Sequence, residues 1–147
     1  MYMIDTNVLV YAANADAPEH GRCSQLLDGL RRGPAPCYTT WSILYEFCRV
    51  VTHPRVFRSP WTPERAWSFV AQLVGGPNLR ILQHGARHPQ IAAALALEVP
   101  ELRGNLVFDA HTVALMREHG IRRIWTRDAD FHRFPGIEVL DPLREAG

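Results

Sequence analysis

The chain has 147 residues, of which 47% are hydrophobic and 21% are charged. This balance is typical of one folded domain and excludes a disordered chain. The formal net charge is only +1, so the overall charge does not by itself indicate a nucleic-acid-binding protein. All 16 basic residues are arginine, however, and arginine suits bidentate contacts with phosphate, so local arginine clusters remain usable for nucleic acid.

The cysteines and the hydropathy pattern indicate where the protein works. Cys23, Cys37 and Cys48 show no C-x-x-C spacing, and their odd number indicates reduced thiols rather than a disulfide framework. No apolar run approaches the roughly 20 residues needed to cross a bilayer. Asp5 also stands where a signal peptide would need its apolar core. We therefore expect a soluble, cytoplasmic protein without membrane contact.

Short apolar runs alternate with segments whose apolar residues recur at helical spacing. In chain order, the pattern predicts a strand at residues 2–4, a helix between Pro18 and Gly33, a strand at 37–39, a helix from Thr40 or Ser42 to His53, a helix at 62–74, a strand at 79–82, helices at about 89–98 and 107–119, and strands at 121–126 and 137–140. Residues 8–13 can either extend the first strand or begin a helix.

Alternating strands and helices imply a mainly parallel central sheet with helices on both faces, which is a three-layer α/β/α fold. We find no internal repeat, low-complexity tract or interdomain linker in the sequence. Residues 1–147 are therefore expected to form a single domain.

Four acidic residues stand in or beside strongly apolar segments, namely Asp5, Glu46, Asp109 and Asp128. An isolated ionised carboxylate in apolar surroundings is costly, so several of them predict a compensating charge. Asp5 and Asp128 lie at or just past the carboxyl ends of strands, where open parallel sheets bind ligands. Glu46 and Asp109 lie on helices that can face the same rim. Mg²⁺ and Mn²⁺ prefer such oxygen ligands, whereas zinc more usually recruits histidine or cysteine.

Each acid also has a purely structural explanation. Asp5, Asp128 and Asp130 could be turn residues. Asp109 could favour the dipole at the start of its helix, and Glu46 could pair with the arginine three positions later. The joint pattern is far less easily explained as an accident than any one of its parts.

The chain resembles PIN-domain ribonucleases, and most of all the VapC toxins of bacterial toxin–antitoxin pairs. The matching pieces are Met3-Ile4-Asp5-Thr6-Asn7, Glu46 on the helix after the second strand, Asn105-Leu106-Val107-Phe108-Asp109-Ala110 and Thr126-Arg127-Asp128-Ala129-Asp130-Phe131. The resemblance extends from about Tyr2 to Pro142, but it is less distinct between His53 and Arg103, where no role carries over residue by residue.

The resemblance implies both a site and an activity. Asp5, Glu46, Asp109 and Asp128 would be the catalytic acids that bind Mg²⁺, with Mn²⁺ as a substitute. Their neighbours Thr6, Asn7 and Thr126 would orient carboxylates or water, while the part played by Asp130 is left open. The protein would be an endoribonuclease that hydrolyses RNA phosphodiesters with a metal-activated water. A cognate antitoxin would inhibit it by placing a basic side chain at the acidic site, and the toxin would be a homodimer.

Other residues have weaker functional signals. Arg49, Arg55, Arg58 and Arg127 are candidates for contact with the RNA backbone, although a solvated surface position explains each equally well. His84 and His88 have the four-residue spacing of a zinc pair, but the neighbouring Gly85 and Pro89 argue against a regular helix, so we expect both at the surface. The aromatic and leucine stripe at 61–74 is expected in the core, and any exposed part of it would be a dimer or antitoxin surface.

Two other classes of protein remain open from the residues alone. A PIN-like fold that binds RNA or a partner without cleavage would be expected to have lost one of the acids, and none is replaced. A phosphoryl-transfer or receiver domain would also place an acid where Asp5 stands. Such a domain usually has a second Asp where this chain has Asn7, and a lysine, which this chain lacks.

Overall fold

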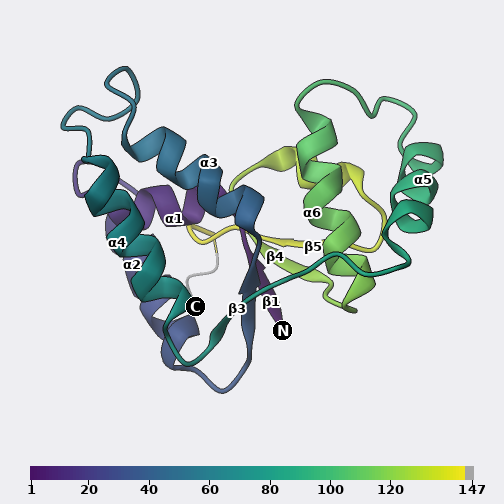
Figure 1. Cartoon of the computed structure of the whole chain (residues 1–147), viewed down its shortest axis with the longest axis horizontal. Coiled ribbons are helices and arrows are strands. Elements are labelled where there is room, and N and C mark those ends of the chain that lie inside the picture. The colour runs from purple at the N-terminus through teal and green to yellow at the C-terminus, as the bar shows by residue number, and fades with distance from the viewer. Residues whose placement is uncertain (145–147) are drawn as a thin grey trace.

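The computed structural model describes residues 1–144 and contains a five-stranded sheet surrounded by helices (Figure 1). In chain order the elements are β1 (Tyr2–Ile4), α1 (Thr6–Ala13), α2 (His20–Arg32), β2 (Cys37–Thr39), α3 (Trp41–Val51), α4 (Pro63–Val74), β3 (Leu79–Ile81), α5 (His88–Glu98), α6 (Leu106–Glu118), β4 (Arg123–Trp125), the 3-10 helix η1 (Ala129–Arg133) and β5 (Glu138–Leu140).

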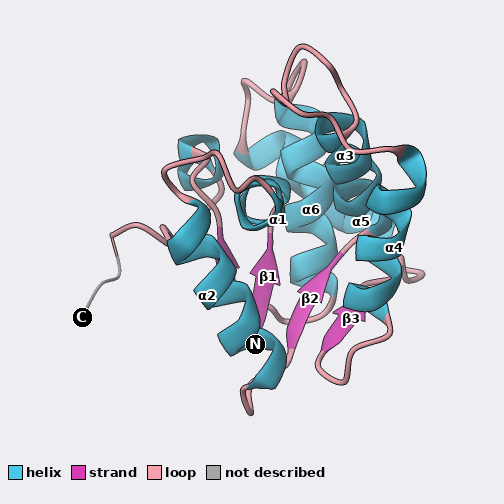
Figure 2. Cartoon of the chain, turned by 90° about the vertical axis from the view of Figure 1, so that its left-hand side faces the viewer, coloured by secondary structure: helices cyan, strands magenta, loops and turns pink. Residues whose placement is uncertain are grey.

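The strands lie in the order β3-β2-β1-β4-β5, and every neighbouring pair is parallel. Helix α1 packs against α2 and α3, and α4 packs against α3, whereas α5 packs against α6. Figure 2 shows the labelled strands side by side, with α2 and α4 on the near side of the sheet and α6 on the far side. The predicted three-layer α/β/α fold is therefore confirmed.

Two threonines that the sequence offers as helix N-caps, Thr40 and Thr62, cap their helices in the structure. Thr40 caps α3, because its hydroxyl accepts a hydrogen bond from the backbone N–H of Ile43 at 3.1 Å. Thr62 caps α4 in the same way through the backbone N–H of Arg65 at 3.2 Å, directly before the proline at the first helical position. The first of these bonds decides between Thr40 and Ser42 in favour of Thr40.

The segment after β1 is a helix rather than a longer strand, because α1 begins at Thr6. Strand β4 is shorter than the apolar run at 121–126 suggests. The 3-10 helix η1 was not predicted at all. It begins where the carboxylate of Asp128 accepts a hydrogen bond from the backbone N–H of Asp130 at 2.9 Å, which is a local turn that apolar periodicity does not reveal.

The strand order places the ends of β1 and β4 at a topological switch point. From β1 the chain passes to β2 and β3 on one side, and then crosses through α5 and α6 to β4 and β5 on the other side. The ladder continues past the ends of these strands, because the N–H of Asp5 donates to the carbonyl of Trp125 at 3.1 Å. Thr126 likewise donates to the carbonyl of Leu140 at 3.0 Å. Asp5 and Thr126 thus lie side by side at the sheet edge where ligands bind in open α/β folds.

The three cysteines are buried and free of disulfides in the structure. Within residues 1–144, no helix combines the length and the apolar character needed to span a membrane.

Candidate active site

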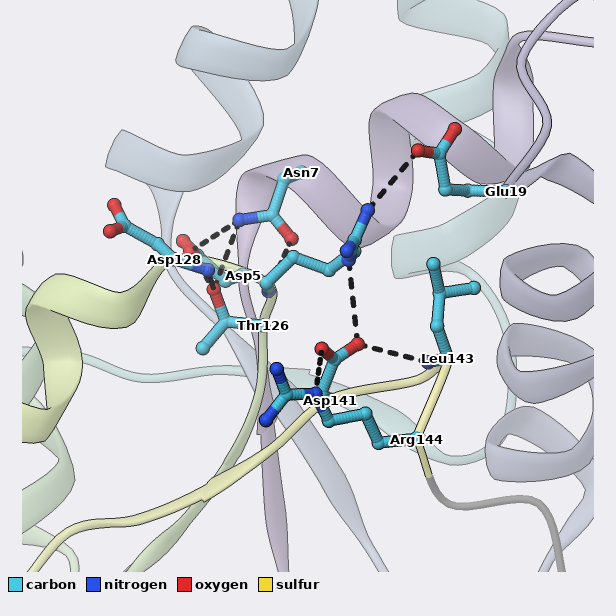
Figure 3. A network of polar contacts seen from close by, with 9 residues as sticks. Asp5, Asn7, Glu19, Thr126, Asp128, Asp141, Leu143 and Arg144 are labelled. Carbon is cyan, nitrogen blue, oxygen red and sulfur yellow. Dashed lines mark hydrogen bonds and ion pairs between the residues drawn. The ribbon is translucent and has the colours of Figure 1, made fainter.

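A buried polar network fixes Asp5 at the end of β1 (Figure 3). Asp5 is 8% exposed, and although it precedes the first residue of α1, its side chain makes no capping bond to that helix. Instead, its Oδ2 accepts hydrogen bonds from the hydroxyl of Thr126 at 2.8 Å and from the amide of Asn7 at 3.1 Å. The same amide donates to the Thr126 hydroxyl oxygen at 3.0 Å. Thr126 and Asn7 therefore orient this carboxylate.

Glu46 reaches the same region from the middle of α3. Its Oε2 accepts a hydrogen bond from the hydroxyl of Thr6, the residue that follows Asp5, at 3.1 Å. Its Oε1 lies 3.8 Å from a guanidinium nitrogen of Arg49, so the ion pair considered as the structural explanation of Glu46 is also present. Both partners of this long pair are half exposed or more, and such pairs contribute little to stability. The closer contact, with Thr6, holds Glu46 beside the start of α1, directly after Asp5.

Three further carboxylates meet beside this network. One oxygen from each of Asp109, Asp128 and Asp130 lies within 4.8 Å of the others. Asp109 stands in the first turn of α6, and the backbone N–H of Asp128 donates to the Thr126 hydroxyl at 3.0 Å. The side chain of Asp130 is 50% exposed and forms an ion pair with Arg133 at 3.2 Å. Asp128 is therefore part of the fixed network, whereas Asp130 lies at its edge.

The pKa values show that these side chains share one electrostatic environment. Burial raises the pKa of Asp109 to about 7, and the negative charges of Asp128, Asp5, Asp130 and Glu46 add to the rise. Burial likewise raises the pKa of Asp5 to about 6, against the hydrogen bonds from Thr126 and Thr6, with the charges of Glu46 and Asp128 adding to the rise. We call these five residues, Asp5, Glu46, Asp109, Asp128 and Asp130, the acidic cluster.

The acidic cluster suits a hard divalent cation. The groups that converge are carboxylate oxygens, which Mg²⁺ and Mn²⁺ prefer, and the cluster contains no imidazole or thiolate that would favour zinc. Carboxylates whose charges raise one another's pKa are stabilised in the ionised form by a bound cation. All four acids singled out from the sequence are thus brought together, and Asp130 joins them.

The candidate arginines are placed differently. The guanidinium of Arg127 is bound by Glu19 at 3.1 Å and by Asp141 at 3.4 Å, so it links the residue before α2 to the segment after β5. Figure 3 shows Glu19 and Asp141 apart from the group formed by Asp5, Thr126 and Asp128. No local sequence signal predicted these two partners. Arg49, Arg55 and Arg58 are exposed on α3 and in the loop that follows it.

Comparisons with known proteins give relatives in sequence and in structure. The family model of the PIN domain matches residues 2–137. Ribonuclease VapC48 of Mycobacterium tuberculosis is 38% identical over 139 residues, which cover 95% of each chain. The crystal structure of VapC20, a sarcin-ricin loop cleaving toxin from the same species, has a TM-score of 0.68 at 22% identity and covers 93% of this chain and 98% of its own.

A toxin–antitoxin complex from Klebsiella pneumoniae contains a chain with a TM-score of 0.63 at 18% identity, covering 97% of this chain and 98% of that one. The two structural matches support the fold, while the family model and VapC48 carry the relationship in sequence. A receiver domain is therefore excluded as the family of this chain. The chain belongs to the PIN-domain family and, within it, to the group of VapC ribonucleases.

Proposed function

We propose that this protein is a metal-dependent endoribonuclease that hydrolyses RNA phosphodiester bonds and acts as the toxin of a toxin–antitoxin pair. The observation that carries the proposal is the acidic cluster, in which four other carboxylates raise the pKa of Asp109 beyond the effect of its burial. A protein that only bound RNA would gain nothing from concentrating negative charge beside a polyanion. The family relationship to VapC48, a ribonuclease, supports the same activity.

Asp5, Glu46, Asp109 and Asp128 are the residues that would hold Mg²⁺, or Mn²⁺ in its place. When bound, such an ion lowers the pKa of water and offsets the negative charge on phosphoryl oxygens. The donor set fits because its atoms are carboxylate oxygens and because their mutual repulsion needs a compensating charge.

The side chains around the acidic cluster have different roles. Thr126 and Asn7 hold the Oδ2 atom of Asp5 in place, and the Thr6 hydroxyl holds the Oε2 atom of Glu46. Asp109, with a pKa of about 7, carries a proton part of the time near neutral pH. We propose that Asp109 would release this proton when the acidic cluster holds a cation.

The partner would be a small antitoxin, as in the toxin–antitoxin complexes that share this fold. Large apolar side chains support a covered surface near the acidic cluster. Phe108, the neighbour of Asp109, is 71% exposed. On α3 and α4, Tyr45 is 61% exposed and contacts Trp67, which is 39% exposed, edge to face with ring centroids 5.1 Å apart. We propose that an antitoxin segment covers part of this surface, that the toxin is a homodimer, and that both act in the cytoplasm.

The test is cleavage of a structured RNA mixture by the purified protein with Mg²⁺ or Mn²⁺, against EDTA and against Asp5→Asn. This substitution keeps the shape of the side chain but removes one charge, so we expect a folded variant without cleavage. Products should carry 5′-phosphate and 3′-hydroxyl ends, because water rather than the RNA 2′-hydroxyl is the nucleophile.

Metal-dependent cleavage that is lost in Asp5→Asn would establish the nuclease and its site together. Cleavage that persists in EDTA, or products with cyclic phosphate ends, would contradict the proposal. If neither metal supports cleavage, a Mg²⁺ titration of the wild type followed by its thermal melting decides between two cases. Stabilisation would indicate an intact site with a narrow RNA target, and none would indicate a fold that binds without cleaving.

A further inference from the structure

Three histidines converge on the side of α6 that faces α5. His84 lies in the loop after β3, His88 is the first residue of α5, and His111 lies in α6. One ring nitrogen from each lies within 4.8 Å of the other two. The Nε2 atoms of His84 and His111 are 2.7 Å apart, and the rings of His84 and His88 meet edge to face with centroids 4.5 Å apart. We call these three residues the histidine cluster.

The spacing of the nitrogens is close to what a transition metal requires. Zinc binds imidazole nitrogen at about 2.0–2.1 Å, so two histidines of a tetrahedral site have nitrogens about 3.3 Å apart. Nε2 of His84 and Nε2 of His111 at 2.7 Å need to part by only a fraction of an ångström to reach that separation. His84 is exposed and His88 and His111 are half-buried, so the rings have room to make this adjustment.

A buried carboxylate already orients one of the rings. Oε2 of Glu118 lies 2.9 Å from Nδ1 of His88, and the Glu118 side chain is only 5% exposed. Its other oxygen accepts a hydrogen bond from the backbone N–H of Gly85 at 2.9 Å. The bond to Nδ1 leaves Nε2 of His88 free as a ligand atom. A carboxylate that fixes the far nitrogen of a histidine in this way is the usual second layer of a zinc site.

Glycine at position 85 leaves room for the Glu118 carboxylate. A Cβ atom there would come within 2.9 Å of the carboxylate oxygen of Glu118. Any larger residue would therefore push Glu118 away from His88, or the loop away from α6. Glu118, on α6, thus links the loop at Gly85 to His88 at the start of α5.

The histidine cluster is separate from the acidic cluster. His111 comes two residues after Asp109 in α6, and two helical residues are turned by about 200° around the axis. The two side chains therefore leave the helix on opposite faces. In Figure 1, α5 lies beside α6 on the side away from α1 and α3.

We propose that His84, His88 and His111 form a binding site for Zn²⁺ or a similar divalent transition metal, with Glu118 as the residue that positions His88. Three imidazole nitrogens favour such ions over Mg²⁺. The exposed side, at His84, leaves the fourth position to water. The bound metal would tie the loop at residues 82–87 and the start of α5 to α6, the helix that carries Asp109.

The test is a calorimetric titration of the full chain, without a polyhistidine tag, with ZnCl₂ in the presence of excess Mg²⁺ to occupy the acidic cluster. We expect one bound Zn²⁺ per chain. His84→Ala should abolish this binding, and Glu118→Gln should weaken it about 10–100-fold, as loss of an orienting carboxylate does. The exposed His132 supplies a matched control, since His132→Ala should bind zinc as the wild type does.

Co²⁺ identifies the ligands, because nitrogen ligands in four-coordinate geometry give intense visible bands and six oxygen ligands give weak ones. The wild type and Asp5→Asn should both give the intense spectrum, and Glu118→Gln should give it only at higher Co²⁺. Zinc affinity that is unchanged in both His84→Ala and Glu118→Gln would overturn the proposal. So would binding lost in Asp5→Asn but kept in His84→Ala, since the ion would then lie in the acidic cluster. Absence of any zinc binding would also overturn it, and would leave a hydrogen-bonded histidine pair and nothing more.

Discussion

Helix α6 contributes to two clusters that differ in chemistry. Toward the sheet edge it presents Asp109 to other carboxylates, and on its opposite face it presents His111 to His84 and His88. The acidic cluster is built at the ends of strands, whereas the histidine cluster is built between a loop and two helices. One helix can therefore serve a hard cation on one face and a softer one on the other, because the ligand atoms rather than the helix decide the preference.

The two clusters also differ in how well their polar groups are paired when no cation is bound. In the histidine cluster, His84 and His111 bond to each other and His88 bonds to Glu118, so each ring already has a polar partner. In the acidic cluster, the raised pKa values of Asp5 and Asp109 show that burial and repulsion oppose ionisation. A cation bound at the acidic cluster is thus expected to raise the free energy of unfolding much more than one bound at the histidine cluster.

Asp128→Asn should reduce cleavage on the order of 100-fold or more, because Asp128 is tied to Thr126 and its charge raises the pKa of both Asp5 and Asp109. Asp130→Asn is the matched comparison two residues away, and it should cost less than about 10-fold, because Asp130 is half exposed and already paired with Arg133. The measurement is single-turnover cleavage at saturating Mg²⁺. Equal losses in the two variants would make Asp130 a full member of the site.

The metal-free protein should lose stability as pH rises from about 4 to about 7. The folded-state pKa values of Asp5 and Asp109 are raised to about 6 and about 7, so the folded state holds protons that the unfolded chain releases near pH 4. Their contribution is fully present below the unfolded pKa and is lost as pH rises through the folded one. For Asp5, the shift corresponds to about 2 to 3 kcal/mol.

Asp5→Asn removes one of these groups, and it should therefore be more stable than the wild type at pH 8 in EDTA. Urea unfolding at pH 5 and pH 8 measures the free energy of unfolding of both proteins. Saturating Mg²⁺ should abolish the advantage of the variant at pH 8. The contrary result is a wild type that gains stability from pH 5 to pH 8 while Asp5→Asn does not. That result would contradict the clustering of the acids.

Thr126→Val should cost about 1–3 kcal/mol of stability, because it removes the shortest hydrogen bond to a buried carboxylate. The pKa of Asp5 should rise further, since the Thr126 hydroxyl lowers it in the wild type. Urea unfolding and an NMR titration of the Asp5 carboxyl carbon measure the two effects. Thr112→Val is the control, because Thr112 is also buried but its hydroxyl donates to the backbone carbonyl of Phe108, at 3.5 Å, rather than to a carboxylate. An unchanged Asp5 pKa in Thr126→Val would rule out the orienting bond.

Arg127→Ala should have the smallest effect, a loss of at most about 1 kcal/mol, because its ion pairs with Glu19 and Asp141 are partly exposed. The salt dependence of RNA binding should not change. An arginine that neutralised a phosphate would instead reduce the slope by about one unit when removed. Such a reduction would return Arg127 to the RNA-binding surface.

The sequence predicts the acidic cluster well, because its geometry follows from topology. Asp5 and Asp128 follow parallel strands, and parallel strands end at one edge of a sheet, so their convergence needs no knowledge of side-chain packing. The start of α4 follows from Thr62-Pro63 for the same kind of local reason. Which residue positions Asp5 is less predictable, but the resemblance to the family pointed to Asn7 and Thr126.

The histidine cluster and the partners of Arg127 are not predictable in this way. The sequence argues correctly against a helix across His84 and His88, since α5 begins at His88. Of the two residues expected at the surface, however, only His84 is exposed, while His88 is half-buried, and the loop brings the two rings together. His111, which lies 27 positions after His84, joins them through the packing of α5 on α6. Such contacts depend on how two helices dock, and single-residue patterns carry no record of that.

The shortness of β1 has a practical consequence for anyone who fuses another protein to this one. Tyr2–Ile4 directly precede Asp5; all three residues pair with β4, and Tyr2 and Met3 also pair with β2. A linker placed before Tyr2 lies outside β1 and does not change the pairing of β1 with β2 and β4. An extra residue between Tyr2 and Asp5 would instead change either the register of β1 or the direction of the Asp5 carboxylate, because neighbouring strand residues point in opposite directions. A fusion can therefore be silent or inactivating according to the position of a single residue.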